Sequence, residues 1–175
     1  MFYLVMDDLC HRLATDLDSA FPDFVEAMSR DIYSGLRRLA GPDEAEDLTQ
    51  EAFIRAYQAL NAYDRRRIEN LRLRGWFWTI ALNLGRNHAR ARARRPILVE
   101  LETVTSHDPE PPDSEAWDRR LAALPSVQRR AVVLRHVVGL SYDEIGQATG
   151  RPETTVRSDV HRGLEKLRNI MEAEK

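Results

Sequence analysis

The chain contains one stretch with unusually clear helix boundaries: Ser141-Tyr142-Asp143-Glu144-Ile145-Gly146-Gln147-Ala148-Thr149-Gly150. Glu144 follows Ser141 by three residues, which is capping-box spacing and predicts a helix that begins directly after Ser141. Gly150 suits the end of this helix, and Pro152 stands where a second helix can start. The second helix has an apolar stripe at helical spacing, namely Val156, Val160, Leu164 and Leu167. A short capped helix, a glycine-containing turn and a longer helix are the layout of a helix-turn-helix.

In a helix-turn-helix the first helix supports the second, whose N-terminal residues lie in the major groove of DNA. Ile145 and Ala148 are expected to pack on the apolar stripe of the second helix. The residues left on its outer face are polar: Glu153, Thr154, Thr155, Arg157, Ser158, His161 and Arg162. Arg can bind guanine through two hydrogen bonds, and Thr or Ser can reach bases or phosphates, so this face suits groove readout. By spacing alone, a helical hairpin with a solvated charged face explains the pattern equally well.

The segment before this motif divides the chain. Apolar residues at Leu121, Leu124, Val132 and Leu134 predict a helix that is interrupted near Pro125 and ended by Gly139. Upstream of it, residues 108–113 (Asp-Pro-Glu-Pro-Pro-Asp) are acidic and proline-rich and cannot form a core. We therefore expect an all-α protein of two separately folded helical units: an N-terminal bundle (1–96), a flexible acidic linker (97–118) and a C-terminal unit (119–175).

The N-terminal unit shows several apolar stripes. One helix is expected around Leu9, Leu13 and Leu17, and a second from Phe24 to the Gly41-Pro42 break. A third helix starts at Pro42 with acids in its first turn, where the helix dipole favours them. A fourth carries Trp76, Phe77, Ile80, Ala81 and Leu84 and extends to about Arg94. The Arg-rich connection between Tyr63 and Gly75 has no clear pattern.

Charge is distributed unevenly although the formal net charge is only −2. Residues 65–95 contain 10 Arg and a single acid, Glu69. On the fourth helix, polar side chains recur at steps of three and four, namely Asn83, Arg86, Asn87 and Arg90. A basic face beside aromatic residues is typical of a surface that follows a nucleic-acid backbone, although some of the aromatics must belong to the core.

The composition excludes several classes of protein. A single cysteine, Cys10, excludes an intramolecular disulfide and a multi-cysteine zinc site. The five His lack metal-ligand spacing, and no nucleophile elbow or phosphate-binding glycine loop occurs. No segment is long and apolar enough to span a bilayer, and the start, whether Met1 or Met6, lacks the features of a signal peptide. We expect a cytoplasmic, non-enzymatic protein without cofactor, metal or membrane insertion.

The stretch Leu140–Gly146 together with Thr155–Ser158 closely resembles the C-terminal region of RNA polymerase sigma factors of the extracytoplasmic-function subfamily. In that family this region reads the −35 promoter element, and Arg157, Ser158, His161 and Arg162 match its pattern. Asp159 departs from it, because that position is more often basic. The resemblance implies that the outer face of the second helix binds −35 DNA.

Two N-terminal segments resemble the same family. Gly75, Trp76, Ile80, Ala81 and Asn83 match its −10-binding helix, whereas Asn87 stands where Asp is frequent. The preceding loop, residues 65–74 here, holds a base flipped from the non-template strand in the family, at a cost of a few kcal/mol. The −10 contacts implied by the resemblance and the basic face are Asn70, Arg72, Arg74, Trp76, Asn83, Arg86, Asn87 and Arg90, with Asn70 chosen for the base pocket by position alone.

Residues 47–53 (Asp-Leu-Thr-Gln-Glu-Ala-Phe) resemble the family's polymerase-docking helix. The residues implied to bind polymerase are Asp47, Gln50, Glu51, Phe53 and Arg55. The implied partners are core RNA polymerase through its β′ and β subunits, promoter DNA, and an anti-sigma factor if one exists. The alternative is a stand-alone helix-turn-helix regulator whose N-terminal helices sense a signal or form a dimer, and a protein-binding adaptor is a third class.

Overall fold

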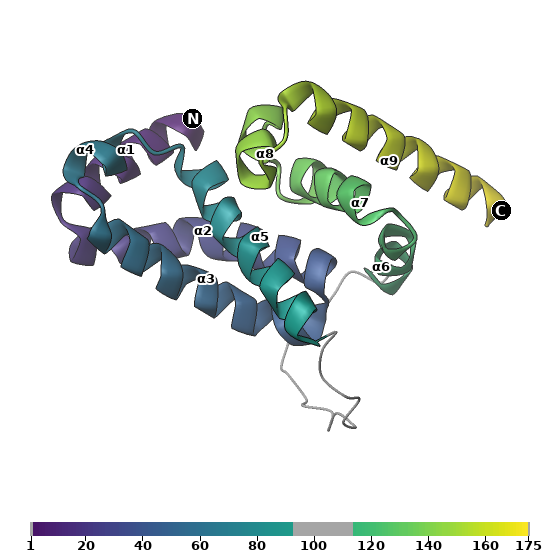
Figure 1. Cartoon of the computed structure of the whole chain (residues 1–175), viewed down its shortest axis with the longest axis horizontal. Helices are drawn as coiled ribbons and strands as arrows, with labels where there is room; N and C mark the ends of the chain where they lie inside the picture. The colour runs from purple at the N-terminus through teal and green to yellow at the C-terminus, as the bar shows by residue number, and fades with distance from the viewer. Residues whose placement is uncertain (1, 93–113, 175) are drawn as a thin grey trace.

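The computed structural model describes residues 2–92 and 114–174, and every regular element in these ranges is helical. The elements are α1 (Phe2–Thr15), α2 (Leu17–Ala40), α3 (Pro42–Ala62), α4 (Arg65–Glu69), α5 (Leu73–Arg92), α6 (Ser114–Ala122), α7 (Ser126–Val132), the π-helical turn η1 (Val133–Val137), α8 (Tyr142–Thr149) and α9 (Glu153–Ala173). Figure 1 shows α1–α5 as one bundle and α6–α9 as a second group, with α8 against α5. The prediction of an all-α chain with two helical units is confirmed.

The helices of the N-terminal unit begin and end where side chains satisfy free backbone groups. Asp16 caps α2 by accepting a hydrogen bond from the Ser19 amide at 3.2 Å, so α2 starts earlier than predicted and includes Leu17. It ends as predicted at Gly41, whose φ of 107° is disfavoured for other residues. Pro42 then occupies the first turn of α3, where its missing N–H costs no hydrogen bond.

The Arg-rich connection is more ordered than its sequence indicates. Asp64 accepts a hydrogen bond from the Arg67 amide at 2.8 Å and starts the short helix α4. Ile68 anchors α4 in the core. The loop before α5 is therefore reduced to residues 70–72.

The C-terminal unit begins earlier than the predicted linker boundary. Residues 97–113 of that linker lie outside the described residues, but Ser114–Asp118 are helical. Ser114 is buried, and its carbonyl oxygen accepts a hydrogen bond from Arg38 at 3.1 Å. Asp118 forms ion pairs with Arg38 and with Arg37, the latter at 3.5 Å. Contacts with α2 thus order a segment that lacks a strong apolar pattern of its own.

The two units also pack on each other, and the C-terminal unit keeps a second cluster of buried side chains that includes Val133 and Leu167. A single cluster of buried side chains runs from the N-terminal helices into α7, η1 and α8 and includes Leu134, Val138 and Ile145. Trp78 belongs to this cluster and is fully buried, whereas the apolar pattern predicted Trp76 and Phe77 on the buried face. The α5 helix has apolar residues on two sides because it packs on α2 and α3 on one side and on α8 on the other.

Gly35 makes the close packing around Trp78 possible. A Cβ atom at Gly35 would lie 2.4 Å from the Trp78 ring and 2.8 Å from a Val138 methyl group. We expect Gly35→Ala to destabilise the protein by ~1–3 kcal/mol, as overpacking does in other cores. Gly85→Ala is the matched control, because a Cβ there meets no atom within 4 Å and alanine favours a helix. The free energy of unfolding, measured with a chemical denaturant, checks both variants. If Gly35→Ala is as stable as the unaltered chain, the close packing of Gly35 on Trp78 is contradicted.

Candidate nucleic-acid and protein interfaces

The helix-turn-helix forms at the predicted residues. Ser141 Oγ accepts a hydrogen bond from the Glu144 amide at 3.1 Å, and Glu144 Oε2 accepts one from the Ser141 amide at 2.7 Å, which completes the capping box. Gly150 ends α8 in the left-handed conformation with φ 68°. The predicted contacts between the two helices involve buried residues: Ile145, Ala148, Val156 and Val160.

The outer face of α9 presents its polar residues to solvent. Exposed side chains there are Glu153, Thr154, Arg157, Ser158, His161 and Arg162, while Thr155 is half-buried. The Arg157 guanidinium donates to Glu153 Oε1 at 2.6 Å and lies 4.3 Å from the centre of the Tyr142 ring. These contacts restrict the Arg157 side chain near the start of α9. The side chain remains 59% exposed, so it is accessible to a ligand.

Two residues of α9 differ from the sequence expectation. Leu164 is 38% exposed, and Gly163 takes its place in the interface, where an added Cβ would lie 2.6 Å from Val132. Asp159, the residue that departs from the family pattern, is buried and forms an ion pair with Arg151 at 2.9 Å. It points inward, so it does not replace a basic side chain on the outer face.

The basic segment before α5 is divided between solvent and interior. Asn70 and Arg72 are exposed; Asn70 donates to the Arg66 carbonyl oxygen at 2.7 Å, and Arg72 forms an ion pair with Asp143. Arg74 is only 9% exposed and points into the junction between the two units. Trp76 is half-buried, with its ring centre 6.2 Å from that of Tyr63.

The polar face of α5 is accessible over its described length. Asn83, Arg86 and Asn87 are exposed, whereas the side chain of Arg90 lies outside the described residues. His88 is also exposed and lies 3.0 Å from Glu44 of α3. The face runs along the helix away from the buried Trp78 side, as its spacing predicts.

On α3 the exposed face combines acids with one apolar residue. Asp47 and Gln50 are exposed, and Glu51 accepts a hydrogen bond from Arg55 at 2.7 Å. Phe53 lies in the core among the rings of Phe21, Phe24 and Phe77, so its assignment to the polymerase-facing surface does not fit this structure. The neighbouring Ile54, which no sequence pattern singled out, is 52% exposed on the same side as Asp47 and Glu51.

The junction of the two units contains a groove of about 540 Å³. Its lining includes apolar residues such as Leu36 and Leu82, one acid, Glu44, and three arginines: Arg86, Arg129 and Arg130. Burial, and then the like charges of Arg86, Arg129 and Arg151, lower the pKa of Arg130 from its usual value. Since α2, α3 and α5 form one wall and α7 the other, the groove exists only while the units are packed together.

Neither a metal centre nor a membrane segment is found in the parts of the chain that the structure describes. Within 2–92 and 114–174 no three His, Cys, Asp or Glu side chains lie close enough to hold a metal ion. None of the helices in these ranges has the length and apolar character needed to cross a membrane.

Comparison with known families finds two matches that together follow the two helical units. The family model described as Sigma-70 region 2 matches residues 24–95, and that described as Sigma-70, region 4 matches residues 114–167. Among curated proteins, the ECF RNA polymerase sigma factor SigW of Bacillus subtilis is 31% identical over 85% of this chain and 87% of its own length. The ECF RNA polymerase sigma factor SigE of Mycolicibacterium smegmatis is 35% identical over 90% of this chain, which spans 65% of that protein.

Solved structures show the same fold. The chain matches CnrH in complex with the cytosolic domain of CnrY with a TM-score of 0.73 and 20% identity, over 97% of this chain and 98% of that one. It also matches the sigma factor RpoE in complex with the anti-sigma factor NepR from Bartonella quintana, with a TM-score of 0.69 and 22% identity, over 87% of this chain and 99% of that one.

Proposed function

Because the chain belongs to the extracytoplasmic-function family of RNA polymerase sigma factors, we propose that it joins core polymerase and directs it to promoters. The exposed face of α9 reads the −35 element, and α4, α5 and the loop between them bind and help to melt the −10 element. The acidic face of α3 docks on the β′ subunit. In this role the chain recognises DNA and performs no chemistry of its own, in the cytoplasm where polymerase acts.

The observation that carries the proposal is the presence of exposed basic side chains on two different helices of one chain. Arg157 and Arg162 are exposed on α9, and Arg86 is exposed on α5 with Asn83 and Asn87 beside it. Basic side chains on helices bind phosphates and base edges, and two such surfaces match a promoter with two separate elements. The exposed acidic face of α3 lies on a third helix and remains available to a protein partner.

The proposal is tested by DNA affinity with and without polymerase. Fragments selected from a randomised pool by the chain together with core polymerase serve as the probe in fluorescence anisotropy. We expect weak binding by the chain alone and tight, sequence-selective binding once core polymerase is added. Tight binding of a palindromic site by a dimer without polymerase supports the stand-alone regulator instead, and no DNA dependence at all supports an adaptor.

Ile54 provides a further prediction for the docking surface. Its exposed side chain beside Asp47 and Glu51 loses contact with water if polymerase covers this face, and burying an isoleucine contributes ~1.5–3 kcal/mol. Ile54→Ala is therefore expected to weaken polymerase binding by roughly tenfold with little change in thermal stability. Phe53→Leu is the matched control, since it alters the core and is expected to lower stability while leaving affinity nearly unchanged. If Ile54→Ala binds polymerase as tightly as the unaltered chain does, Ile54 is not part of the interface.

An anti-sigma factor remains an expected partner. The solved RpoE chain that matches this fold was captured with the anti-sigma factor NepR. In this chain the groove at the junction, which is lined by apolar residues and by three arginines against one acid, suits an acidic amphipathic segment of such a protein. Binding there is proposed to favour the packed arrangement of the two units over a separated one.

A further inference from the structure

The second helix of the helix-turn-helix carries a buried acid, Asp159. Its side chain is 10% exposed, and its Oδ2 atom forms an ion pair with Nη2 of Arg151 at 2.9 Å. Among the described residues no group forms a hydrogen bond with this oxygen, so the Arg151 guanidinium is the cation in contact with it. Removing one partner of a buried ion pair leaves an uncompensated charge, which makes Arg151 necessary to Asp159.

Arg151 also contacts the first helix of the motif. Its amide donates to the Gly146 carbonyl oxygen of α8 at 3.1 Å. A Cβ atom at Gly146 would lie 2.9 Å from the Arg151 carbonyl oxygen, so the turn lies directly against α8. One residue of the turn therefore holds α8 through its main chain and α9 through its side chain.

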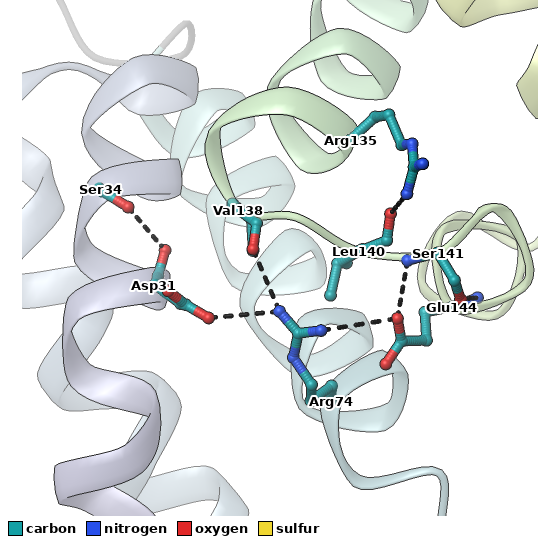
Figure 2. Close-up of polar contacts among 8 residues, drawn as sticks. All are labelled: Asp31, Ser34, Arg74, Arg135, Val138, Leu140, Ser141 and Glu144. Carbon is teal, nitrogen blue, oxygen red and sulfur yellow. Dashed lines mark hydrogen bonds and ion pairs between the residues drawn. The ribbon is translucent and has the colours of Figure 1, made fainter. Parts of the chain in front are cut away.

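The first helix is a fixed support for this connection. Figure 2 shows its N-terminal end, where the Glu144 carboxylate accepts the Ser141 amide hydrogen bond and lies 3.7 Å from Arg74 of α5. Arg135 donates to the Leu140 carbonyl oxygen at 2.9 Å and supports the segment before α8. With α8 held at this end, the Arg151–Asp159 pair can set the orientation of α9 at the other end.

The orientation of α9 matters because the pair lies beside the proposed DNA contacts. Asp159 follows Ser158 directly and lies about 60° from Arg162 around the helix axis. Groups that bind a ligand must be held within about 0.5 Å and 10–20° of the productive position. The buried contacts of Val156 and Val160 are apolar and non-directional, whereas an arginine–carboxylate pair has a defined geometry. The pair therefore adds a directional contact that the apolar interface lacks.

The pair also removes a charge that would oppose DNA. Duplex DNA carries about one negative charge per 1.7 Å of its axis. At physiological salt, charges interact over ~8 Å, so an unpaired carboxylate at the edge of the proposed −35 surface would repel the phosphates. The positive charge of Arg151 cancels that of Asp159.

We propose that Arg151 and Asp159 are positioning residues of the −35 surface: their ion pair fixes the orientation of α9 and keeps the Asp159 charge from opposing DNA. In this role neither residue contacts a base. The ion pair itself is a feature of the fold, whereas its effect on promoter selection rests on the proposed function.

Asp159→Asn tests the orientation of α9. The full chain with core polymerase is offered a promoter fragment that the unaltered chain selects, and variants of it at each −35 position. Asp159→Asn removes the ion pair without leaving a buried charge, so we expect about a fivefold loss of preference at the −35 element with little change in thermal stability. The double variant Arg151→Gln/Asp159→Asn should show the same loss, because two residues that act as one unit are not additive.

Arg151→Gln tests the charge. It leaves Asp159 buried without its partner, so affinity for the selected promoter should fall by about tenfold or more, and adding Asp159→Asn should restore at least about threefold. Arg151→Lys keeps the charge and should lose less affinity than Arg151→Gln. Arg119→Gln is the matched control, because Arg119 is exposed on α6 and belongs to no proposed contact. Its affinity should stay within about twofold of the unaltered chain.

An unchanged −35 preference of Asp159→Asn overturns the proposal, and this arm decides alone if Arg151→Gln fails to fold. A uniform loss of affinity by Arg151→Gln on every fragment, which Asp159→Asn does not restore, also overturns it, since Arg151 then contacts a phosphate itself. If the unaltered chain with core polymerase selects no fragment, the proposed function is contradicted, and the pair loses its role with it.

Discussion

Reversing the charge of Asp47 and Glu51 to lysine is expected to weaken binding of core RNA polymerase by roughly 100-fold while the fold remains intact. Both side chains lie on the exposed face of α3, where the resemblance to the family's docking helix places the polymerase. Opposing like charges across an interface costs several kcal/mol, and about 3 kcal/mol corresponds to that change in affinity. The dissociation constant measured with labelled chain and core polymerase checks this directly.

The control for this double variant carries the same change of charge elsewhere. Asp8 and Glu26 are exposed acids of α1 and α2, so Asp8→Lys with Glu26→Lys alters net charge equally but leaves α3 unchanged. We expect its affinity for polymerase to stay within about twofold at moderate salt, where distant charges are screened. Equal affinities of the two double variants would falsify the docking surface on α3.

Replacing Arg157 by alanine is expected to weaken promoter recognition at the −35 element by ~1–3 kcal/mol and to relax the preference for one base position. Arg157 stands at the N-terminal end of α9, is exposed, and is oriented by Glu153 and by the Tyr142 ring. A side chain oriented in this way loses little freedom when it forms two hydrogen bonds with a guanine. Initiation rates on promoters that vary at each −35 position measure the effect.

Lys166→Ala separates base reading from simple charge loss. Lys166 is exposed later on α9, where contact with phosphate or solvent is expected. Its removal should weaken initiation to a similar extent on all promoters and reduce the salt dependence. If Arg157→Ala behaves in the same uniform manner, Arg157 contacts the DNA backbone and does not specify a base.

The local features of the C-terminal unit could be predicted closely from the sequence, because each has a strong local cause. Ser141 and Glu144 define the start of α8 through the capping box, and Gly150 defines its end. The Gly41-Pro42 break between α2 and α3 is equally local. Capping and turn residues act within a few positions, so their effect is visible in the one-dimensional pattern.

Features that depend on contacts between the units could not be predicted in this way. Trp78 was missed because α5 buries two sides, one of them against α8, and a single apolar stripe describes only one side. Arg74 was assigned to DNA because an arginine next to a basic loop has no local signal for burial. Its acidic neighbours, Asp31 and Glu144, lie 43 and 70 positions away in the sequence (74 − 31 and 144 − 74).

Phe53 and Ile54 illustrate a smaller error of the same kind. Both residues are large and apolar, and adjacent positions on a helix differ by about 100° in direction. The resemblance favoured Phe53 for the partner surface, but the surrounding rings of Phe21, Phe24 and Phe77 hold it in the core. Ile54 is consequently the apolar residue available to a partner.

Run-off transcription with purified core polymerase on a promoter library tests the central claim most directly. The account predicts transcripts with defined start sites on a subset of promoters, and only when the chain, core polymerase and promoter are all present. It further predicts that these promoters share two sequence elements, one read by α9 and one by the α4–α5 segment. No transcripts from any promoter, with core polymerase that is active when supplied with another sigma factor, would contradict it.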